Sequence, residues 1–190
     1  MPSSPDTHSD EDEVTFVPPA QKKLNEILEA DKDDASLQRY KEKLLGAVGS
    51  EAVVIDAQNP ERVIVRSITL LADHGVVSTQ ALPPPGNFTL KVKEGERYKL
   101  QFDFHVQREI VCGLKYLHKV SRSIVPVAKE KYMIGSYGPS KEVVSYTTPW
   151  ENAPSGALAR GNYKVKSKIT DDDNHVYSEF SWNLEIASSW

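Results

Sequence analysis

The sequence has almost no cysteine and no long apolar run. Its 190 residues contain one cysteine, Cys112, so neither an intramolecular disulfide nor a zinc site built from cysteines can form. No stretch approaches the roughly 20 apolar residues that a membrane-spanning helix needs. The first residues are acidic, whereas a secretory signal would be basic and then apolar. These absences argue against a disulfide-bonded extracellular domain and lead us to expect a cytoplasmic protein.

A strong charge of either sign is also missing. Lys and Arg number 23 against 27 Asp and Glu, a net charge of −4, which argues against a nucleic-acid partner bound through a basic surface. The charge is unevenly divided, however. Residues 1–60 hold 13 acidic and 6 basic residues (net −7), and residues 61–190 hold 14 and 17 (net +3). We therefore expect an acidic arm over residues 1–60 and one globular domain over residues 61–190.

Motifs for catalysis and for cofactors are absent. The five histidines show no H-x-H or H-x-x-x-H spacing, and no G-x-S-x-G, G-x-G-x-x-G or P-loop motif occurs. Cys112 lies in an apolar run, which predicts an inert core residue and not a nucleophile. The run Asp171-Asp172-Asp173 offers ligands to a hard cation, but we favour a turn between strands, where Asp is common. We expect no enzyme activity, no metal and no cofactor.

The acidic arm contains a polar tail followed by two short helical patterns. The tail up to about Val14 has no apolar periodicity, which predicts disorder. Helical spacing of apolar residues then occurs in residues 20–31, and again after a turn in which Asp33 or Asp34 can cap the second helix, at Leu37, Tyr40 and Leu44. Helices this short need a surface to pack on. Either they pack on the chain's own domain or they fold on a partner, and we favour the partner.

The domain shows the period of two that is typical of β-strands. In RYKLQFDFHV (97–106) every second residue is apolar, as in a half-buried strand. Further strands are predicted in segments 63–71, 87–93, 109–120, 142–148, 163–170 and 178–187. The breaks PPPGN, KEGE, GSYGPS, PSGALARG and DDDN leave no room for crossover helices. The fold we expect is all-β: an immunoglobulin-like antiparallel β-sandwich with a partly disordered, helical N-terminal arm.

Five runs of the sequence occur together in an order that is specific to one protein family. They cover about residues 16–190 and are PPAQKKLNEILEADKDDASLQRYKEKLLG, REIVCGLKYLHKV, KYMIGSYGPSKE, TPWENAPSGALARGNYKVKSKITDDDN and FSWNLEI. Together they resemble the Rho GDP-dissociation inhibitor family. The resemblance includes both the acidic helix pair and the long segment from GSYGP to TDDD, which are not general features of immunoglobulin-like domains.

The resemblance implies a function in GTPase regulation. It implies a sandwich whose sheets part to admit the geranylgeranyl group of a prenylated Rho-family GTPase, and an arm that folds as a helical hairpin on the GTPase switch regions. Such a protein blocks GDP release, favours the GDP-bound form and extracts the GTPase from membranes. We expect a heterodimer with the GTPase, otherwise a monomer, with no stable membrane insertion.

The family pattern also implies roles for individual residues. The residues implied to bind the GTPase switch regions are Asp33, Asp34, Tyr40, Ser136, Asp172 and Asp173. The residues implied to line the prenyl pocket are Leu70, Phe88, Tyr98, Ile110, Leu158, Val165, Phe180 and Trp182. Two positions depart from the pattern. Phe180 stands where the family often has Trp, which leaves the choice between farnesyl and geranylgeranyl open, and Asn152 replaces an acidic residue expected to face the GTPase's basic tail.

Two alternatives remain at this point. A general carrier of prenyl or acyl cargo would share the sandwich but ignore the nucleotide switch. An adhesion-type sandwich is disfavoured by the missing cysteines. The acidic run from Asp10 to Glu13 either contacts the basic tail of the GTPase or is only a solvating end.

Overall fold

The computed structural model describes residues 34–39 and 53–190. Residues 35–39 form a short helix. Its cap is Asp34, because Oδ1 of this residue accepts hydrogen bonds from the backbone N–H groups of Ser36 (2.8 Å) and Leu37 (3.0 Å). The acidic tail, the first helical pattern, Asp33 and Tyr40 all lie outside the described residues.

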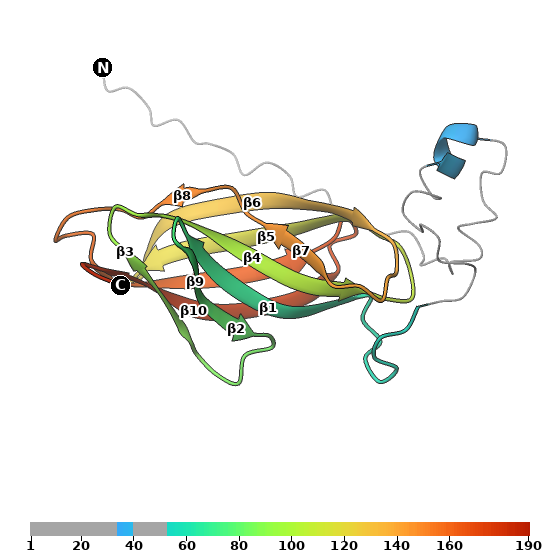
Figure 1. Ribbon diagram of the computed structural model, residues 1–190, viewed down its shortest axis with the longest axis horizontal. Helices are drawn as coiled ribbons and strands as arrows, with labels where there is room; N and C mark the ends of the chain where they lie inside the picture. Colours follow the sequence, from blue (N-terminus) through green and yellow to red (C-terminus); the bar gives the residue numbers. More distant parts are fainter. Residues whose placement is uncertain (1–33, 40–52) are drawn as a thin grey trace, which may run out of the picture.

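The described domain consists of ten strands in two sheets that pack face to face (Figure 1). The strands are β1 (Val63–Ala72), β2 (Gly75–Ala81), β3 (Thr89–Lys93), β4 (Arg97–Val106), β5 (Val111–Arg122), β6 (Val125–Tyr137), β7 (Val144–Thr147), β8 (Glu151–Asn152), β9 (Gly161–Thr170) and β10 (Val176–Ala187). We call the sheet with the order β2-β1-β4-β7 sheet A, and β8 also pairs with β4 in it. Sheet B has the order β3-β10-β9-β5-β6.

The β-sandwich expected from the alternating pattern is confirmed. Each of the seven predicted segments coincides with a strand. Two features differ from the expectation. The run GSYGPS was expected to break the chain, but residues 135–137 complete β6. The strands β3 and β10 pair in parallel, with Leu90 opposite Leu184, while every other strand pair in the described part of the chain is antiparallel.

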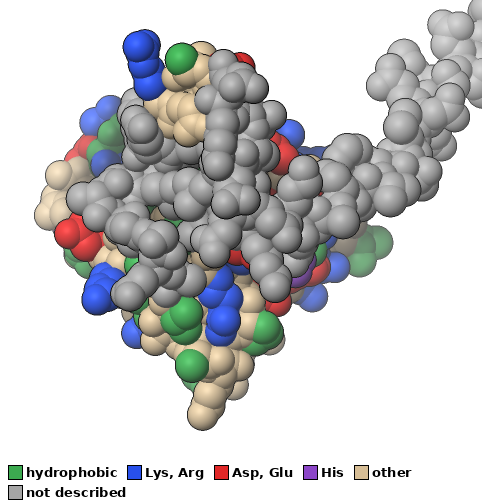
Figure 2. All heavy atoms as spheres, turned by 90° about the vertical axis from the view of Figure 1, so that its right-hand side faces the viewer, with side chains coloured by type: hydrophobic (Ala, Val, Ile, Leu, Met, Phe, Trp, Pro, Cys, Tyr) green, Lys and Arg blue, Asp and Glu red, His purple; other side chains and the backbone are tan. Residues whose placement is uncertain are grey.

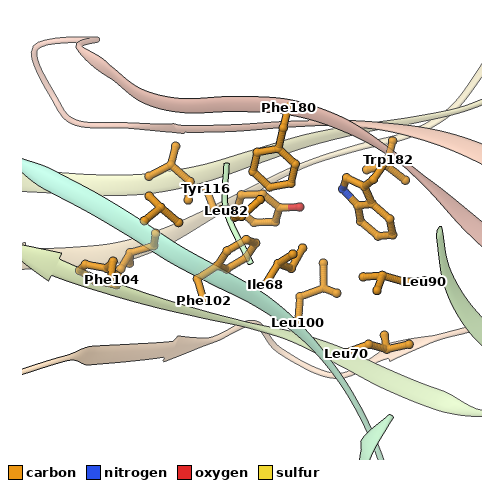
Figure 3. Packing of buried hydrophobic residues seen from close by; sticks show 14 of the residues in the cluster. Ile68, Leu70, Leu82, Leu90, Leu100, Phe102, Phe104, Tyr116, Phe180 and Trp182 are labelled. Carbon is orange, nitrogen blue, oxygen red and sulfur yellow. The ribbon is translucent and has the colours of Figure 1, made fainter. Parts of the chain in front are cut away.

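The core fills the space between the two sheets. Alternate residues of the long strands are buried, and those of β4 meet those of β5 and β10 across the sandwich (Figure 3). The rings of Phe102 and Tyr116 pack with their centroids 4.4 Å apart. Because burial of each large side chain contributes about 1.5–3 kcal/mol, this packing is the main source of cohesion between the sheets.

One chain of hydrogen bonds runs along the sheet B side of this apolar core. Ser167 Oγ accepts a hydrogen bond from Trp182 Nε1 at 2.9 Å and lies 2.9 Å from the hydroxyl of Tyr116. All three side chains are buried. Each polar atom therefore has a partner, and the core avoids the cost of burying an unsatisfied group.

Gln107, a fully buried side chain, attaches the segment that leads into β1. Its Oε1 accepts hydrogen bonds from the backbone N–H groups of Ile55 and Asp56, both at 2.9 Å. Its Nε2 donates to the carbonyls of Asn59 and Glu61, both at 2.8 Å. The expected boundary between arm and domain, at residue 60, thus falls within a segment that is bound to the sandwich.

No helix among residues 34–39 and 53–190 is long and apolar enough to cross a membrane.

Replacing Ser167 with Ala tests the buried hydrogen-bond chain. The indole N–H of Trp182 and the hydroxyl of Tyr116 would both lose a buried partner, so we expect the free energy of unfolding to fall by about 1–3 kcal/mol. Urea denaturation measures this change. The matched control is Ser181→Ala on the outer face of β10, which should shift stability by less than about 0.5 kcal/mol. Equal effects of the two substitutions would contradict the role of Ser167.

Candidate functional site

The sandwich has two chemically different ends, and β5 reaches both. At 12 residues, β5 is roughly 40 Å long. Its first residues lie beside the turn between β9 and β10, at the right of Figure 1, and its last residue contacts the loop before β9, at the left. The first end carries the TDDD motif. The second end carries a cavity.

The cavity lies between the two sheets and has a volume of about 340 Å³. This is at the lower end of the range for small-molecule sites, about 300–1,000 Å³. Its walls are mainly aliphatic and aromatic, and come from β4 and β8 of sheet A and from β5, β6, β9 and β10 of sheet B. The lining residues are Tyr98, His118, Val120, Val127, Ala128, Glu130, Tyr132, Glu151, Asn152, Pro154, Tyr163, Leu184 and Ile186.

A carboxylate held by two tyrosines forms the polar side of the cavity. Glu151 accepts hydrogen bonds from the hydroxyl of Tyr98 (2.8 Å) and from that of Tyr132 (2.7 Å). Burial, reinforced by the negative charge of Glu151, raises the pKa of both phenols, so both remain protonated donors at neutral pH. Since Tyr132 belongs to sheet B and Glu151 to sheet A, this group also links the sheets.

His118 completes the same wall as a neutral ring. It is buried, and its ring packs edge-on against the rings of Tyr116 and Tyr132, with centroid distances of 5.4 and 5.7 Å. Burial lowers the pKa of His118, and the carboxylates of Glu151 and Glu130 only partly oppose that shift. Its Nδ1 has no hydrogen-bond partner within the described part of the chain. A neutral imidazole leaves the cavity wall without a cation.

The residues implied to bind the prenyl group are only partly brought to this cavity. Tyr98 lines it. Phe88, itself half-buried, stacks on Phe180 and on Trp182, with ring centroids 6.3 and 6.0 Å away. The residues of the set that are buried without lining the cavity are Leu70, Ile110, Val165, Phe180 and Trp182. Leu158 is 91% exposed on the loop before β9 and does not line the cavity.

Most lining residues were not singled out from the sequence. The inward positions of Tyr163, Leu184 and Ile186 were visible in the alternation, but alternation does not reveal which inward side chains leave space between them. Ala128, Glu130 and Tyr132 belong to β6, which was not predicted as a strand. A prediction of β6 would have indicated these three.

At the other end, Asp171 is the buried centre of the turn after β9. Its Oδ2 accepts hydrogen bonds from Arg62 Nη2 (2.9 Å) and the Tyr177 hydroxyl (2.7 Å), and its Oδ1 accepts one from the N–H of His175 (2.9 Å). Burial is the main cause that raises the pKa of Tyr177, and the hydrogen bond from its hydroxyl to Asp171 raises it further. Asp171 therefore acts within the fold and orients the next two residues.

Asp172 lies directly over Gly113 of β5. A Cβ at Gly113 would approach Asp172 Oδ2 to 1.9 Å, so a side chain there would force the Asp172 carboxylate to move, and the left-handed φ of +62° favours glycine. Asp172 lies 3.7 Å from Lys115 Nζ and its side chain is 63% exposed. The backbone N–H of Gly113 also donates to Ser136 Oγ at 3.0 Å. Ser136 and Asp172 are thus both brought to Gly113.

This end of the molecule faces the viewer in Figure 2, where acidic and basic side chains lie side by side on the visible part of the described surface. Asp173 is half-buried in the same turn as Asp172. Asp34, in contrast, belongs to the separate helical segment, where one of its carboxylate oxygens caps the helix.

Comparison with known proteins decides the family. The family model described as RHO protein GDP dissociation inhibitor matches residues 2–189. The chain belongs to the Rho GDP-dissociation inhibitor family. A probable rho GDP-dissociation inhibitor of Caenorhabditis elegans is 47% identical over 98% of this chain and 98% of its own length. Rho GDP-dissociation inhibitor 1 of Homo sapiens is 42% identical over 97% and 91%.

Rho GDP-dissociation inhibitor 1 of Arabidopsis thaliana is 38% identical over 88% of this chain and 70% of its own length. Among solved structures, a Niemann-Pick type C2 protein from Japanese carpenter ant gives a TM-score of 0.45 at 8% identity, covering 71% of this chain and 100% of that one, which is too distant to inform function. Members of the Rho GDP-dissociation inhibitor family regulate Rho GTPases as inhibitors and are not enzymes.

The expectation that Cys112 is a core residue was wrong. The residue is exposed on β5, next to the TDDD turn, and its carbonyl accepts a hydrogen bond from Asp172 N at 3.2 Å. Partial burial of the thiol and the charges of Asp172 and Asp173 raise its pKa, which disfavours the reactive thiolate. Within residues 34–39 and 53–190, no group of three or more His, Cys, Asp or Glu residues is arranged to hold a metal ion.

Substitutions at Asp171 and Asp172 should separate a structural carboxylate from an exposed one. Asp171→Ala leaves Arg62 with its charge largely buried and unpaired, so we expect a loss of about 3–5 kcal/mol in the free energy of unfolding. Asp172→Ala removes an exposed carboxylate with one distant ion pair and should cost less than about 1 kcal/mol. Denaturant titration of both variants measures the difference, and comparable losses would contradict the assignment.

Proposed function

We propose that this chain binds prenylated Rho-family GTPases and shelters the prenyl group, geranylgeranyl in the first place, between its two sheets. The observation that supports this most strongly is the cavity of about 340 Å³, whose walls are mostly apolar. Its polar exceptions at Glu151 are already paired with Tyr98 and Tyr132. An apolar chain entering the cavity would therefore displace no hydrogen bond.

The cavity leads towards the residues implied to bind the prenyl group. Side chains on one face of a strand are two residues apart. On β10, Leu184 lines the cavity and Trp182 is the next side chain on the same inner face. On β9, Tyr163 lines it and Val165 follows in the same way. A prenyl group that enters the cavity and parts the sheets further would therefore meet Trp182 and Val165 next.

The two sheets can separate in this way because no disulfide joins them, since the chain has a single cysteine. They are held together by packing and hydrogen bonds alone. Leu70, Phe180 and Trp182 are buried in the cargo-free structure, so the sheets must move apart for these side chains to contact a prenyl group. Phe88 is half-buried and lies against Phe180 and Trp182, which makes it a side chain that can shift without breaking a hydrogen bond.

The opposite end is suited to the GTPase itself. Asp172 and Asp173, together with Ser136, would receive the switch II region, where a carboxylate can pair with an arginine through two hydrogen bonds. The part of the arm that includes Asp33, Asp34 and Tyr40 would lie on the switch regions and block GDP release. The GDP-bound GTPase is the favoured partner, in a cytoplasmic heterodimer, and the free inhibitor is a monomer.

The free energy of moving a prenyl group from water or from a bilayer into the cavity shows that the two ends have different roles. Burying a prenyl chain of roughly 20 carbons, at ~0.8 kcal/mol per carbon, gains on the order of 10 kcal/mol relative to water. It gains almost nothing relative to a bilayer, because lipid tails solvate the same group. The cavity therefore avoids the free-energy cost of exposing the prenyl group to water. Extraction itself depends on polar contacts that form only away from the membrane, at the switch regions and the basic tail.

Deleting residues 1–50 should separate inhibition from prenyl binding. The sandwich keeps its core and the Gln107 contacts, so the truncated chain should still bind a geranylgeranylated peptide, while it should no longer slow GDP release. Nucleotide-release assays on a prenylated GTPase and fluorescence binding of the peptide give the two readouts. Unchanged inhibition by the truncated chain would refute the role of the arm.

Filling the cavity should weaken prenyl binding selectively. Ala128→Phe places a ring among the lining residues, and we expect affinity for a geranylgeranylated peptide to fall at least tenfold, whereas Ala81→Phe, at an exposed position at the end of β2, should have no effect. The same assay tests the alternative of a general prenyl or acyl carrier. Such a carrier would bind the peptide nearly as tightly as the whole prenylated GTPase, and that result would overturn the role of the switch contacts.

A further inference from the structure

The outer face of sheet B carries lysines in adjacent positions on adjacent strands. Lys119 of β5 is directly opposite Lys166 of β9 on one side and Lys129 of β6 on the other. Side chains in such positions have Cβ atoms about 4.5–5.5 Å apart, and like charges there repel. Two residues further along, Lys168 and Lys131 flank Leu117 in the same way. We call these five lysines and Lys164, on the same face of β9, the lysine face.

The lysine face is poorly neutralised within the domain. None of its six lysines has a carboxylate within ion-pair distance among residues 34–39 and 53–190. The registered neighbours on β10 are Glu179, opposite Lys168, and Ser181, opposite Lys166. One carboxylate thus stands beside six lysines. A flat array of this kind fits an extended anionic surface better than a single small anion.

Exposed apolar residues lie where β5 and β6 meet, at one end of the lysine face. Ile124, in the turn between β5 and β6, is 95% exposed, and Val125 is 61% exposed. Arg122 ties this turn to the loop before β9, since its guanidinium donates hydrogen bonds to the carbonyls of Leu158 and Arg160. Leu158 on that loop is 91% exposed. Ile124, Val125 and Leu158, which we call the apolar tip, are thus held at one end of the sandwich.

The apolar tip lies at the same end of the sandwich as the cavity. Val120 and Val127, which flank the β5–β6 turn, both line the cavity, as does Pro154 in the loop that carries Leu158. Cationic side chains near an apolar tip are the combination that binds anionic membranes, because lysines attract lipid headgroups while apolar residues enter the interface. An acidic protein would match the lysines but not the exposed tip.

We propose that the lysine face and the apolar tip form a docking surface for the surface of an anionic phospholipid bilayer. In this orientation the end of the sandwich that holds the cavity lies against the lipid surface, which shortens the path of a prenyl group from bilayer to cavity. The docking surface exists in the cargo-free chain, and only its purpose rests on the proposed function. The turn with Asp172 lies at the opposite end of β5 from the apolar tip.

Vesicle sedimentation with the full chain tests the proposal. The chain should bind vesicles of phosphatidylcholine with 30% phosphatidylserine at low salt and should not bind phosphatidylcholine alone. Combining Lys119→Gln, Lys129→Gln and Lys166→Gln should lower the affinity roughly a hundredfold, as expected for three lysines near an anionic surface. The matched control, Lys93→Gln with Lys99→Gln and Lys141→Gln, has the same net charge and should bind like the wild type.

The apolar tip has a separate variant. Ile124→Ser with Val125→Ser keeps the charge and should lower vesicle affinity several-fold, and an unchanged affinity would overturn the position of the tip in the bilayer. Equal losses in the two lysine triples would overturn the assignment of the lysine face. If the wild-type chain binds no anionic vesicle, the proposal fails and an acidic protein surface becomes the partner. Inhibition of GDP release in detergent, without vesicles, should be unchanged in the lysine variant, so failure of docking is distinguishable from failure of the proposed function.

Discussion

Side-chain packing between two sheets is the interaction on which the rest of this molecule depends. No disulfide is possible within the chain, so the apolar core carries the cohesion. At each end a carboxylate adds a polar link. Asp171 holds Arg62 and Tyr177 at one end, and Glu151 receives the hydroxyls of Tyr98 and Tyr132 at the other. Such a sandwich can open locally, because the apolar packing can loosen at one place while the polar links at Asp171 and Glu151 still connect the two sheets.

The distribution of charge follows the same division into ends. Near Asp171 the chain presents carboxylates to solvent, and glycine at residue 113 of β5 leaves the space that one of them occupies. Around Glu151 the hydroxyls of Tyr98 and Tyr132 are paired with the carboxylate, and the cavity wall is largely apolar. One strand, β5, therefore connects a surface suited to a protein partner with a cavity suited to a lipid group, and a membrane-facing surface lies beside that cavity.

The sequence predicted the sandwich better than the cavity, for physical reasons. Central strands such as β4 have one face in the core, and their alternation is strong. The strands β2 and β6 lie at sheet edges, where more side chains are exposed on both faces, so their pattern is weak. Alternation also carries no information on strand direction, which hid the parallel pairing of β3 with β10. A cavity depends on how inward side chains fail to fill space, and of the implied prenyl residues only Tyr98 lines it. The close approach of Asp172 to Gly113 follows from a strand pairing that no local pattern encodes.

In the complex we propose, the prenyl group of the GTPase occupies the space between the sheets at the Glu151 end. Photo-crosslinking tests it most directly: a Rho GTPase carrying a diazirine-labelled geranylgeranyl group is bound to the full chain, irradiated and mapped by mass spectrometry. We expect crosslinks to lining residues on β5, β6 and β10, such as Val120, Ala128 and Leu184. Crosslinks confined to the outer faces of the sheets or to the turn at Asp172 would contradict it.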